Sequence, residues 1–562
     1  MKRKVKEISQ NPKHKISNSI IQALIACIAV LWVCLPALQN GFVNWDDNVY
    51  VYDNQLLISG SAWAYVTSVV QGNFHPITLL TLKIDHILFG LSPKGYHAHS
   101  LIWHFLNAVL AYFLMLRLSG DKNFAFVLSL GFALHPLHVE SFTWISARKD
   151  LVYSAFTLMG LIAWHDYLDK AGWRNLMLSL LCLLLALLSK PMAVVMPMLM
   201  GLLLYLHPKG SDAAVRKQGY VWIGVACLPA LLLALWTIQL QGSEGAIRDI
   251  PNLGMHHNAM IAAHGIFLYI LKGILPISLS ALYPYPPLAS GLSWAFYAAP
   301  FGLMLLAFLF WKYRQKLQPI IPGMAWMLIC LLPVLQLIPA GSAIAADRYF
   351  YLAAFGFLWA CTGAFRHMPR QWGKYVLYGF CAFWAVLSYR RVAVWQSGES
   401  LFRSILVEYP DNPTALNNLG DALERKGRSA EACTNFARAV EVKPDFPQAL
   451  FNLAVCRSAA GDYAAAKQLN QQALRYKPGY ADAWSNLGMC YGATGVYDSA
   501  RYTLDRALQF HPEFADAWAN YGMLHLIEGR RDSAKYCFQK AMAIDQDPNS
   551  MAAYNLKLME QE

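Results

Sequence analysis

The sequence predicts an all-α protein in two parts, a multi-span helical membrane domain followed by an array of helical repeats. Three observations support this prediction. Residues 18–390 contain repeated apolar runs near 20 residues long, the length that crosses the hydrocarbon core of a bilayer. Residues 401–562 have an ordinary soluble composition, and proline recurs in them every 34 residues. The 562-residue chain is 56% hydrophobic and only 14% charged, whereas a typical soluble protein is about 25% charged.

The first element is a basic segment, 1–17, which carries six lysine and arginine residues and one glutamate. An apolar run over 18–38 follows it. A basic segment before the first apolar run indicates an uncleaved signal anchor with a cytoplasmic N-terminus. The loop 40–97 is then extracytoplasmic.

Ten further apolar runs follow, and short basic loops between them lie on the cytoplasmic side when each run is counted as a span. They cover about 98–117, 123–139, 150–168, 174–189, 191–207, 219–240, 292–311, 319–340, 346–365 and 373–390. The run 259–283 would reverse the sides of the later basic loops, so we predict that it is a re-entrant or interfacial element. The segment 76–91 is apolar but interrupted by Lys83 and Asp85, which favours an interfacial helix. The prediction is 11 spans, with the repeat array outside the cytoplasm.

Charge and cysteine content exclude some classes of protein. The net charge of +12 does not indicate nucleic-acid binding, because the basic residues cluster in short loops between apolar runs. The eleven cysteines contain no C-x-x-C pair. We expect them to act as small buried hydrophobic residues.

The C-terminal part, 401–562, has an internal period. Proline, glycine and alanine recur every 34 residues, at Pro410, Pro444, Pro478 and Pro512, at Gly427, Gly461, Gly495 and Gly529, and at Ala432, Ala466, Ala500 and Ala534. A 34-residue period with small residues at helix crossings is the signature of tetratricopeptide repeats. The glycine supports a turn between two helices and the proline ends the second helix. We predict four repeats and a terminal capping helix.

One asparagine recurs at the same position of each first helix, at Asn418, Asn452, Asn486 and Asn520. These helices line the concave face of such an array. Each side-chain amide can both donate to and accept from a peptide backbone, so the column is a candidate acceptor-peptide-binding site. It resembles the asparagine ladder of the tetratricopeptide domain in O-GlcNAc transferase. The alternative is a polar groove position without a ligand.

Ionisable residues beside membrane spans are costly and are therefore candidates for function. Those on the outer side of the predicted topology, with one neighbouring tyrosine, are Asp46, Asp47, His75, His135, His138, Glu140, Arg148, Lys149, Asp150, Lys190, Asp347, Arg348 and Tyr349. Acids and bases from several loops suit a reaction that needs a base and a clamp for a phosphate.

Each candidate also has a structural alternative. Asp46 or Asp47 could cap a short helix. The two histidines beside one glutamate are a weak metal pattern, and hydrogen-bonded interfacial histidines are the alternative. Arg148 and Lys149 could be interfacial anchors, and Arg348 could pair with a buried acid.

A set of segments in a fixed order carries a resemblance to a known family. They are "NWDDNVYVYDN", "HAHSLIWHFLNAVLAYFL", "HPLHVESFTWISARKDLVYSAF", "LLSKPM", "YPYP" and "ADRYFYLAAFGF", followed by the repeats. The chain resembles the TMTC proteins, which are transmembrane and tetratricopeptide-repeat protein O-mannosyltransferases of the GT-C class of glycosyltransferases. In eukaryotic members the lysine motif continues with an acid, whereas Pro191 follows Lys190 here. This departure suggests a bacterial branch.

The resemblance implies a GT-C-like membrane domain over 18–400, with 40–97 as the catalytic first external loop. It implies transfer of a sugar, of mannose type, from a polyprenyl-phosphate-linked donor to Ser or Thr hydroxyls of extracytoplasmic proteins, with inversion. Asp46 and Asp47 match the paired acids of that loop. One would act as the base while its neighbour orients the acceptor. The residues expected to bind the donor phosphate are Arg148, Lys149, Lys190 and Arg348.

The expected partners are the lipid-linked donor, a protein or peptide acceptor in the repeat groove, and membrane lipids, without nucleic acid. No metal or other cofactor is expected. The expected location is a bacterial inner membrane, or the endoplasmic reticulum if the protein is eukaryotic. Two other classes remain open. A transporter or flippase for lipid-linked substrates would place charged pairs near the bilayer midplane, and a non-catalytic scaffold would not need the outer acids and bases. Within the enzyme class, the acceptor could instead be a lipid or a glycan.

Overall fold

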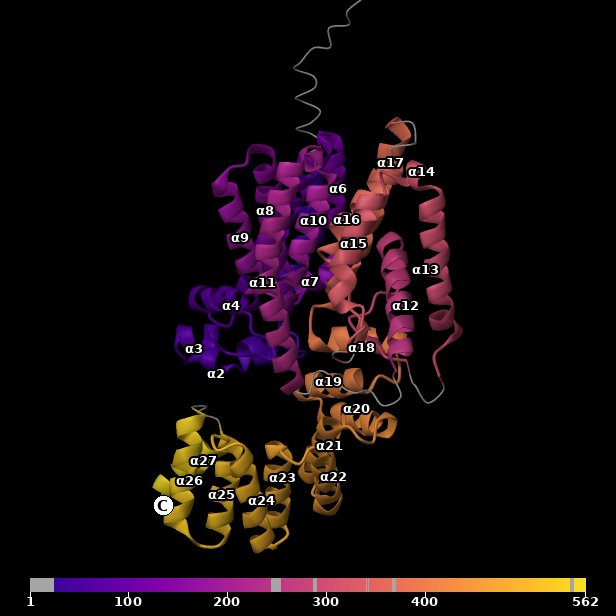
Figure 1. The fold of residues 1–562 in the computed structure, drawn as a ribbon. Helices are drawn as coiled ribbons and strands as arrows, with labels where there is room; N and C mark the ends of the chain where they lie inside the picture. Colours follow the sequence, from indigo (N-terminus) through magenta and orange to yellow (C-terminus); the bar gives the residue numbers. More distant parts are fainter. Residues whose placement is uncertain are drawn as a thin grey trace, which may run out of the picture. The chain divides into compact units, whose positions relative to one another are not determined.

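The computed structural model describes residues 25–243, 254–286, 291–339, 341, 343–365, 370–545 and 550–561. The predicted basic segment 1–17 lies outside these residues. The chain divides into two compact units, Met1–Leu401 and Phe402–Glu562, and Figure 1 traces the fold of each.

Helices dominate the first unit (Figure 1). In chain order they are Ile25–Gln39, α2 (Gln55–Ile58), α3 (Ala62–Val66), α4 (Pro76–Phe89), α5 (Pro93–Ser119), α6 (Lys122–Leu134), α7 (Val139–Thr143), α8 (Arg148–Lys170), α9 (Trp173–Leu187), α10 (Met196–Leu206), α11 (Ala213–Ser243), α12 (Met255–Ile274), α13 (Trp294–Lys312), α14 (Arg314–Leu317), α15 (Ile321–Leu331), α16 (Ala353–Ala364) and α17 (Arg370–Val394). α18 (Gly398–Glu408) contains the boundary between the units. A small antiparallel pair of strands, β1 (Tyr283–Pro284) and β2 (Ala343–Ala345), is the one addition to the predicted all-α class within the described residues.

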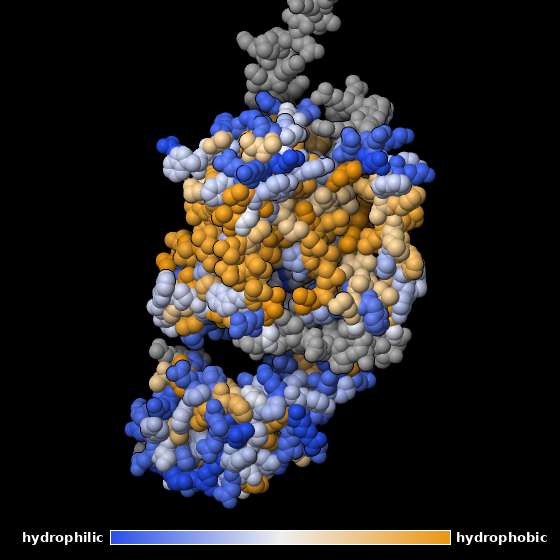
Figure 2. All heavy atoms as spheres, in the orientation of Figure 1, coloured by the Kyte–Doolittle hydropathy of each residue, from blue (hydrophilic) through white to orange (hydrophobic). Residues whose placement is uncertain are grey.

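Three of the described helices, α5, α11 and α13, are long and apolar enough to cross a membrane. α6 and the segment Pro136–Thr143 make a fourth candidate if their 54° bend lies within one span. Shorter apolar helices occupy several other predicted runs, at Ile25–Gln39, Trp173–Leu187, Pro191–Leu206, Ile321–Val334 and Ala353–Ala364. Figure 2 shows hydrophobic residues in a broad zone across this unit, bordered by hydrophilic ones. The unit is a polytopic membrane domain, whereas the predicted number of 11 spans is not confirmed.

The two segments that were not counted as membrane spans, 259–283 and 76–91, both form helices over most of their length. The run 259–283 forms most of α12 and then an irregular segment that ends in β1. In α4 the charged residues point inward, since Lys83 is 8% exposed and Asp85 is fully buried, while Ile87 and Leu88 are 69% and 65% exposed. The Lys83 ammonium donates to the Leu57 carbonyl oxygen at 2.6 Å. An apolar outer face with satisfied inner charges suits a helix that lies against lipid.

The second unit is built from four helix pairs and a last helix, which confirms the predicted tetratricopeptide array (Figure 1). The pairs are α19 (Pro413–Glu424) with α20 (Ser429–Val442), α21 (Pro447–Ala459) with α22 (Tyr463–Tyr476), α23 (Ala481–Ala493) with α24 (Tyr497–Phe510), and α25 (Ala515–Ile527) with α26 (Arg531–Ile544), followed by α27 (Met551–Gln561). The periodic glycines between the helices of each pair have φ from 73° to 79°, a left-handed conformation that favours glycine. The periodic alanines are fully buried.

The expectation for the cysteines is wrong at four described positions, because Cys27 and Cys227 are exposed and two others are paired. Cys433 in α20 and Cys456 in α21 form a disulfide, with their Cα atoms 5.8 Å apart. They are 23 residues apart in sequence, and only the stacking of the first repeat on the second brings them together. Because structural disulfides form mainly in oxidising compartments, this bond favours the predicted extracytoplasmic location of the repeats.

Candidate active site

The loop 40–97 folds as a small helical cap with its own apolar core. The short helix Asn48–Tyr52, α2, α3 and α4 pack around that core, which is formed by Tyr50, Val51, Leu57, Tyr65, Val70, Leu79, Leu82, Tyr96 and Ile145. The Tyr65 hydroxyl donates to the Tyr50 carbonyl oxygen at 2.8 Å. This core fixes the backbone that carries the paired acids.

The two acids have different surroundings. Asp47 is 1% exposed, and its carboxylate accepts hydrogen bonds from the backbone N–H of Val43 at 3.0 Å and of Ser146 at 2.9 Å. The Ser146 hydroxyl donates to it at 2.5 Å. Burial raises the pKa of Asp47 to about 6, although the hydrogen bonds from Ser146 and Val43 oppose this shift. Asp47 therefore ties the cap to the segment that precedes α8.

Asp46 is partly buried, and no described residue makes a hydrogen bond or ion pair with its carboxylate. Burial raises its pKa, while the charges of Lys149 and Arg348 act in the opposite direction. A carboxylate with unengaged oxygens beside two cations can accept a proton from a hydroxyl group. Of the two acids, Asp46 is the one whose carboxylate is not held by hydrogen bonds to described residues, whereas that of Asp47 is.

Lys149 is the second residue of the long helix α8 and contacts the cap. Its ammonium is 4.9 Å from the centre of the Tyr50 ring and 3.5 Å from the Tyr50 hydroxyl. Within the described part of the chain it has no acid at ion-pair distance. Its charge is therefore available to an anionic ligand.

Lys190 and Arg348 converge on one tyrosine. The Lys190 ammonium and the Arg348 guanidinium lie 5.5 Å and 4.8 Å from the centre of the Tyr349 ring. Each cation also pairs with a buried acid at 2.5 Å, Lys190 with Asp150 and Arg348 with Glu140. Arg348 therefore pairs with a buried acid, which was the structural alternative for this residue. An ammonium has three N–H donors and a guanidinium has five, so both cations retain donors beyond these pairs.

Several buried polar atoms next to these cations have no hydrogen-bond partner among the described residues. They are both ring nitrogens of His75, Oε2 of Glu140 and Oδ2 of Asp150. His75 is 1% exposed. Burial lowers the pKa of His75 well below its usual value, and the charges of Lys149 and Lys190 lower it further. Because buried polar atoms are nearly always hydrogen-bonded, a neutral His75 and these two oxygens fit a site for a polar ligand.

Arg148 is set apart from these cations. It is fully buried, forms an ion pair with Asp85, and donates to the Tyr96 carbonyl oxygen at 2.6 Å and the Ser100 hydroxyl at 3.2 Å. Its donors are used within the protein. This geometry favours a structural role, in which Arg148 joins α4 and α5 to the start of α8.

The other two candidate histidines, His135 and His138, are hydrogen-bonded residues of the core. The Leu137 N–H donates to Nδ1 of His135 at 3.2 Å, which leaves Nε2 to donate to the Gly273 carbonyl oxygen at 2.9 Å. His138 Nδ1 lies 2.7 Å from the Phe132 carbonyl oxygen. Both fit the hydrogen-bonded alternative.

Asp347 lies in a buried network whose other two members, Tyr283 and Arg391, were not among the candidates from the sequence. It accepts a hydrogen bond from the Tyr283 hydroxyl at 2.8 Å and pairs with Arg391 at 3.3 Å. Arg391 is 7% exposed. In the sequence Arg391 belongs to a basic pair at the end of an apolar run, and such a pair is indistinguishable from a topology signal.

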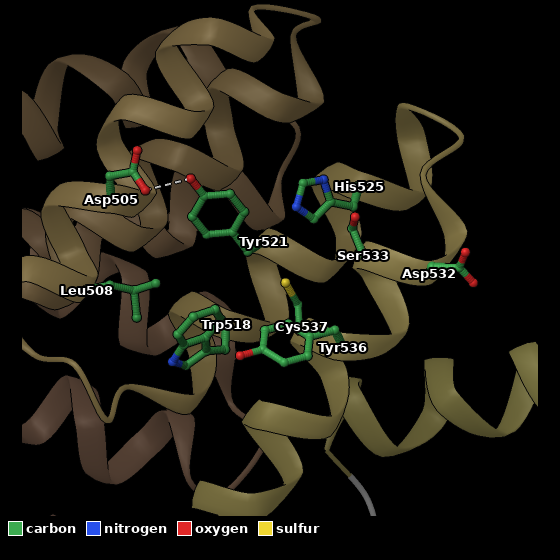
Figure 3. A pocket seen from close by; sticks show the side chains of 9 residues that line it. All are labelled: Asp505, Leu508, Trp518, Tyr521, His525, Asp532, Ser533, Tyr536 and Cys537. Atoms are coloured by element: carbon green, nitrogen blue, oxygen red, sulfur yellow. Dashed lines mark hydrogen bonds between the residues drawn. The ribbon is translucent and has the colours of Figure 1, made fainter.

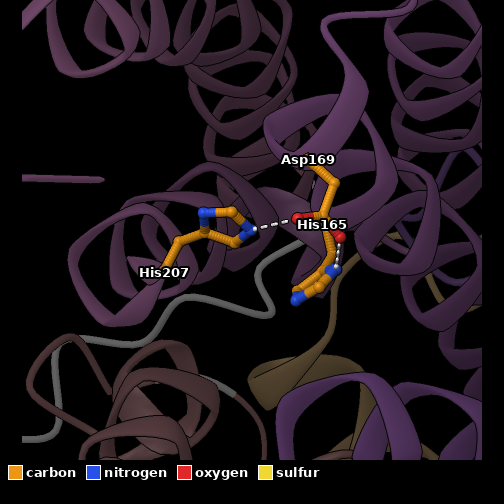
Figure 4. Close-up of side chains that lie close together, drawn as sticks. All are labelled: His165, Asp169 and His207. Carbon is orange, nitrogen blue, oxygen red and sulfur yellow. Dashed lines mark ion pairs between the residues drawn. The ribbon is translucent and has the colours of Figure 1, made fainter. Parts of the chain in front are cut away.

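A second group of possible metal ligands lies elsewhere in the first unit, where α8 ends (Figure 4). Asp169 is 3.3 Å from His207 Nε2 and 3.7 Å from His165 Nδ1. The Lys209 N–H donates to His207 Nδ1 at 3.2 Å, which places the proton of a neutral His207 on Nε2. Because a metal ligand needs a lone pair at that atom, this arrangement fits a hydrogen-bonded His–Asp pair.

Two of the four asparagines in the column make hydrogen bonds to the preceding repeat. Asn452 Nδ2 donates to Oδ1 of Asn417 in the preceding repeat at 2.9 Å, and Asn520 Nδ2 donates to the Ser485 hydroxyl at 2.9 Å. Asn486 is 8% exposed and its Nδ2 has no partner among the described residues. Asn418 Oδ1 accepts a hydrogen bond from Asn417 Nδ2 at 3.2 Å. The column therefore offers the side-chain oxygens of Asn452 and Asn520, together with the Asn486 amide, to a bound chain.

Known proteins resemble this chain over both units. It is 23% identical over 488 residues to Protein O-mannosyl-transferase TMTC3 of Mus musculus, covering 76% of this chain and 52% of that protein. It is 25% identical over 468 residues to a protein O-mannosyl-transferase of Caenorhabditis elegans, covering 77% of this chain and 64% of that protein. These relatives confirm the resemblance to the TMTC proteins. The chain spans about half to two thirds of the length of these relatives.

Two further comparisons concern the repeats. Residues 388–557 match the family described as Cilia and flagella-associated protein 70 C-terminal domain. Among solved structures, MamA is 24% identical and covers 27% of this chain and 82% of its own, with a TM-score of 0.23. YrrB, titled a TPR protein with an unusual peptide-binding site, is 22% identical and covers 29% of this chain and 82% of its own, with a TM-score of 0.24.

Proposed function

We propose that this protein is an inverting membrane glycosyltransferase of the GT-C type. It transfers a sugar, of mannose type, from a polyprenyl-phosphate-linked donor to Ser or Thr hydroxyls of extracytoplasmic proteins. The relatives named as protein O-mannosyl-transferases support this class. The observation that carries the proposal is the unengaged carboxylate of Asp46 beside the charges of Lys149 and Arg348.

Asp46 is the proposed base. A Ser or Thr hydroxyl is a poor nucleophile at neutral pH, and a carboxylate that accepts its proton during attack contributes about 10²–10⁴-fold in rate. The acceptor oxygen forms a bond to the anomeric carbon while the bond from that carbon to the phosphate oxygen breaks. A single displacement inverts the anomeric centre. Asp47 is a positioning residue, because its hydrogen bonds to Val43 and Ser146 hold the loop that carries Asp46.

The leaving group is a lipid phosphate whose negative charge increases as the glycosidic bond breaks. Lys149, Lys190 and Arg348 are the proposed phosphate ligands, because they retain N–H donors and lie near one another around Tyr50 and Tyr349. Fixed donors aimed at developing charge lower the barrier without reorganisation. Arg148 is left out of this set because its donors are used within the protein.

The repeat unit is proposed to hold the protein acceptor in an extended form. The side-chain oxygens of Asn452 and Asn520 can accept hydrogen bonds from backbone N–H groups without reading a sequence. The Cys433–Cys456 disulfide supports an extracytoplasmic location. We place the protein in a bacterial inner membrane on the departure at Pro191.

A transporter or flippase for lipid-linked substrates is the other candidate that the membrane unit allows. It would need charged groups near the middle of a span. Asp46 follows the first apolar helix, and Arg348 lies in the short helix Asp347–Phe350 before α16. Both positions are at the ends of apolar helices, and the relatives named as protein O-mannosyl-transferases favour transfer chemistry over transport.

Transfer is tested with the purified chain in liposomes, a polyprenyl-phosphate-linked mannose and an extended protein acceptor. We expect hexose on Ser or Thr by mass spectrometry, and its loss with Asp46→Asn. Hexose formation that is absent with the wild-type chain, or equal in Asp46→Asn, would overturn the proposal.

The proposed sidedness has its own test. A reporter fused after Glu562 should be active only outside the cytoplasm, and one inserted near Lys316 only inside it. The opposite result would place the repeats and the candidate site on the cytoplasmic side, away from the proposed acceptors.

A further inference from the structure

Two pockets with the same construction lie between consecutive repeats of the second unit. The larger has a volume of about 490 Å³ and lies between the third and fourth repeats (Figure 3), where Leu508, Trp518, Ser533 and Tyr536 line it. The second has a volume of about 370 Å³. Its corresponding residues, each 34 positions earlier, are Leu474, Trp484, Ser499 and Tyr502.

Each pocket has two aromatic walls at nearly a right angle. Trp518 and Tyr536 have ring centres 6.4 Å apart and planes at 85°, and the earlier pair has 6.3 Å and 83°. The Trp518 N–H donates to the Pro512 carbonyl oxygen at 3.1 Å, which fixes the indole in the repeat. Tyr536 is 54% exposed. Each pocket therefore presents one fixed indole and one accessible phenol to a ligand.

Polar groups lie beside these walls in both pockets. In the larger pocket Asp505 accepts a hydrogen bond from the Tyr521 hydroxyl at 2.7 Å (Figure 3). In the smaller one Gln471, the residue that corresponds to Asp505, donates to the Tyr491 hydroxyl at 3.1 Å. Together with the serine hydroxyl, the lining of each pocket offers ring faces and several hydrogen-bonding groups.

The differences in charge between the pockets restrict the ligand that both can share. The larger pocket is lined by Asp505 and Asp532, whereas the smaller has Arg475 and no acid in its lining. A cationic side chain would suit only the first pocket, and an anion only the second. An aliphatic side chain could pack on the ring faces, but it would make no hydrogen bond to the serine hydroxyls or the other polar groups of the two linings.

A neutral ring with an apolar face and several hydroxyls suits both pockets. We propose that the two pockets bind pyranose sugars, with the carbon–hydrogen face of the ring against the indole and the hydroxyls on the polar groups. Both volumes lie within the range of small-molecule sites. The inference goes beyond the proposed function, because it assigns a sugar-binding site that takes no part in transfer. In a glycosyltransferase, such sites would retain an acceptor that already carries sugar.

The test is saturation-transfer NMR on the full chain in lipid nanodiscs without glycolipid, with methyl α-D-mannopyranoside and no lipid-linked donor. We expect transfer from the protein to the ring protons of the sugar. The double variant Tyr502→Ala with Tyr536→Ala should weaken binding roughly three- to tenfold, because it removes one aromatic contact from each pocket. Tyr476→Ala is the matched control, since Tyr476 is 51% exposed and lies outside both linings. It should bind as the wild type does.

Two further variants test the polar groups of the larger pocket and the independence of sugar binding from catalysis. Asp505→Ala tests the polar side without removing an aromatic residue, and it should weaken binding at the larger pocket. Asp46→Asn should bind the sugar normally, which separates this inference from the proposed catalysis. Absence of saturation transfer to the wild type, or equal binding by the double tyrosine variant, would overturn the proposal. Displacement of the sugar by an equimolar proline-rich peptide would instead identify the pockets as peptide sites, and would also overturn it.

Discussion

Asp46→Asn and Asp47→Asn should have different effects, although the two acids are neighbours in the sequence. The Asp46 carboxylate makes no hydrogen bond to a described residue, and burial disfavours its ionised form, so its replacement by asparagine should not lower the free energy of unfolding. The same change removes the proposed base, and the transfer rate should fall by about 10²–10⁴-fold.

For Asp47 the structure predicts a loss of stability. An asparagine at this position can keep its oxygen toward Ser146, but its NH₂ group then faces the Val43 N–H, which is also a donor. Leaving one buried donor without an acceptor costs about 1–3 kcal/mol, and the remaining bonds lose their charge assistance. The cap should open more readily, and activity should fall because Asp46 loses its position.

The assay compares both variants in the same liposomes by transfer rate, thermal unfolding and limited proteolysis of the loop 40–97. Asp46→Asn should lose the rate at normal stability, and Asp47→Asn should lose both. If Asp46→Asn retains a rate within threefold of the wild type, or unfolds as readily as Asp47→Asn, the separation of roles is refuted.

Three other predictions follow from the two units. Because the charge of Lys149 lowers the pKa of Asp46, Lys149→Met should raise that pKa and shift the acidic limb of the kcat/KM profile to higher pH, whereas Lys149→Arg should not; an unshifted limb in Lys149→Met would contradict the assignment of the base. Replacing Cys433 and Cys456 by Ser should lower the stability of the repeat unit by roughly 3 kcal/mol in chemical unfolding, and a reductant should have the same effect on the wild type alone. Replacing the column Asn418, Asn452, Asn486 and Asn520 by Ala should weaken transfer to a full-length protein but not to a short hydroxyl acceptor. Asn417→Ala is its control, since it removes the hydrogen bonds of Asn417 with Asn418 and Asn452 and keeps the four column residues; equal loss in both would indicate structural damage.

The repeat unit could be predicted from sequence almost completely, because its information is local. A turn at Gly461 needs a positive φ, and a helix crossing at Ala466 needs a small side chain. Each requirement recurs every 34 residues, so the period reveals it. The disulfide could not be predicted in the same way, because Cys433 and Cys456 meet only through the stacking of two repeats.

The sequence indicated which residues belong to the candidate site, but it did not indicate which of them form ion pairs with one another. Arg148 and Lys149 are adjacent at the start of α8, yet successive residues on a helix point about 100° apart. Arg148 therefore forms a buried ion pair with Asp85, while Lys149 lies against the Tyr50 ring. The sequence indicates which ionisable side chains are costly to place near a membrane. The partners of these side chains depend on how α4 packs on α8.

The acids beside Lys190 and Arg348 have a consequence for the proposed reaction. Buried cations without counter-charges would be costly before the donor binds, and Asp150 and Glu140 supply those charges. The product phosphate carries more negative charge than the donor. Three unbalanced cations would therefore bind the product more tightly than the substrate and slow its release.

With Asp150 and Glu140 in place, Lys149 is the one proposed phosphate ligand that has no acid at ion-pair distance among the described residues. Its charge can attract the donor, while the paired cations contribute N–H donors more than net charge. This division lets the site stabilise the charge that develops during transfer. It also limits the affinity for the lipid phosphate that must then leave.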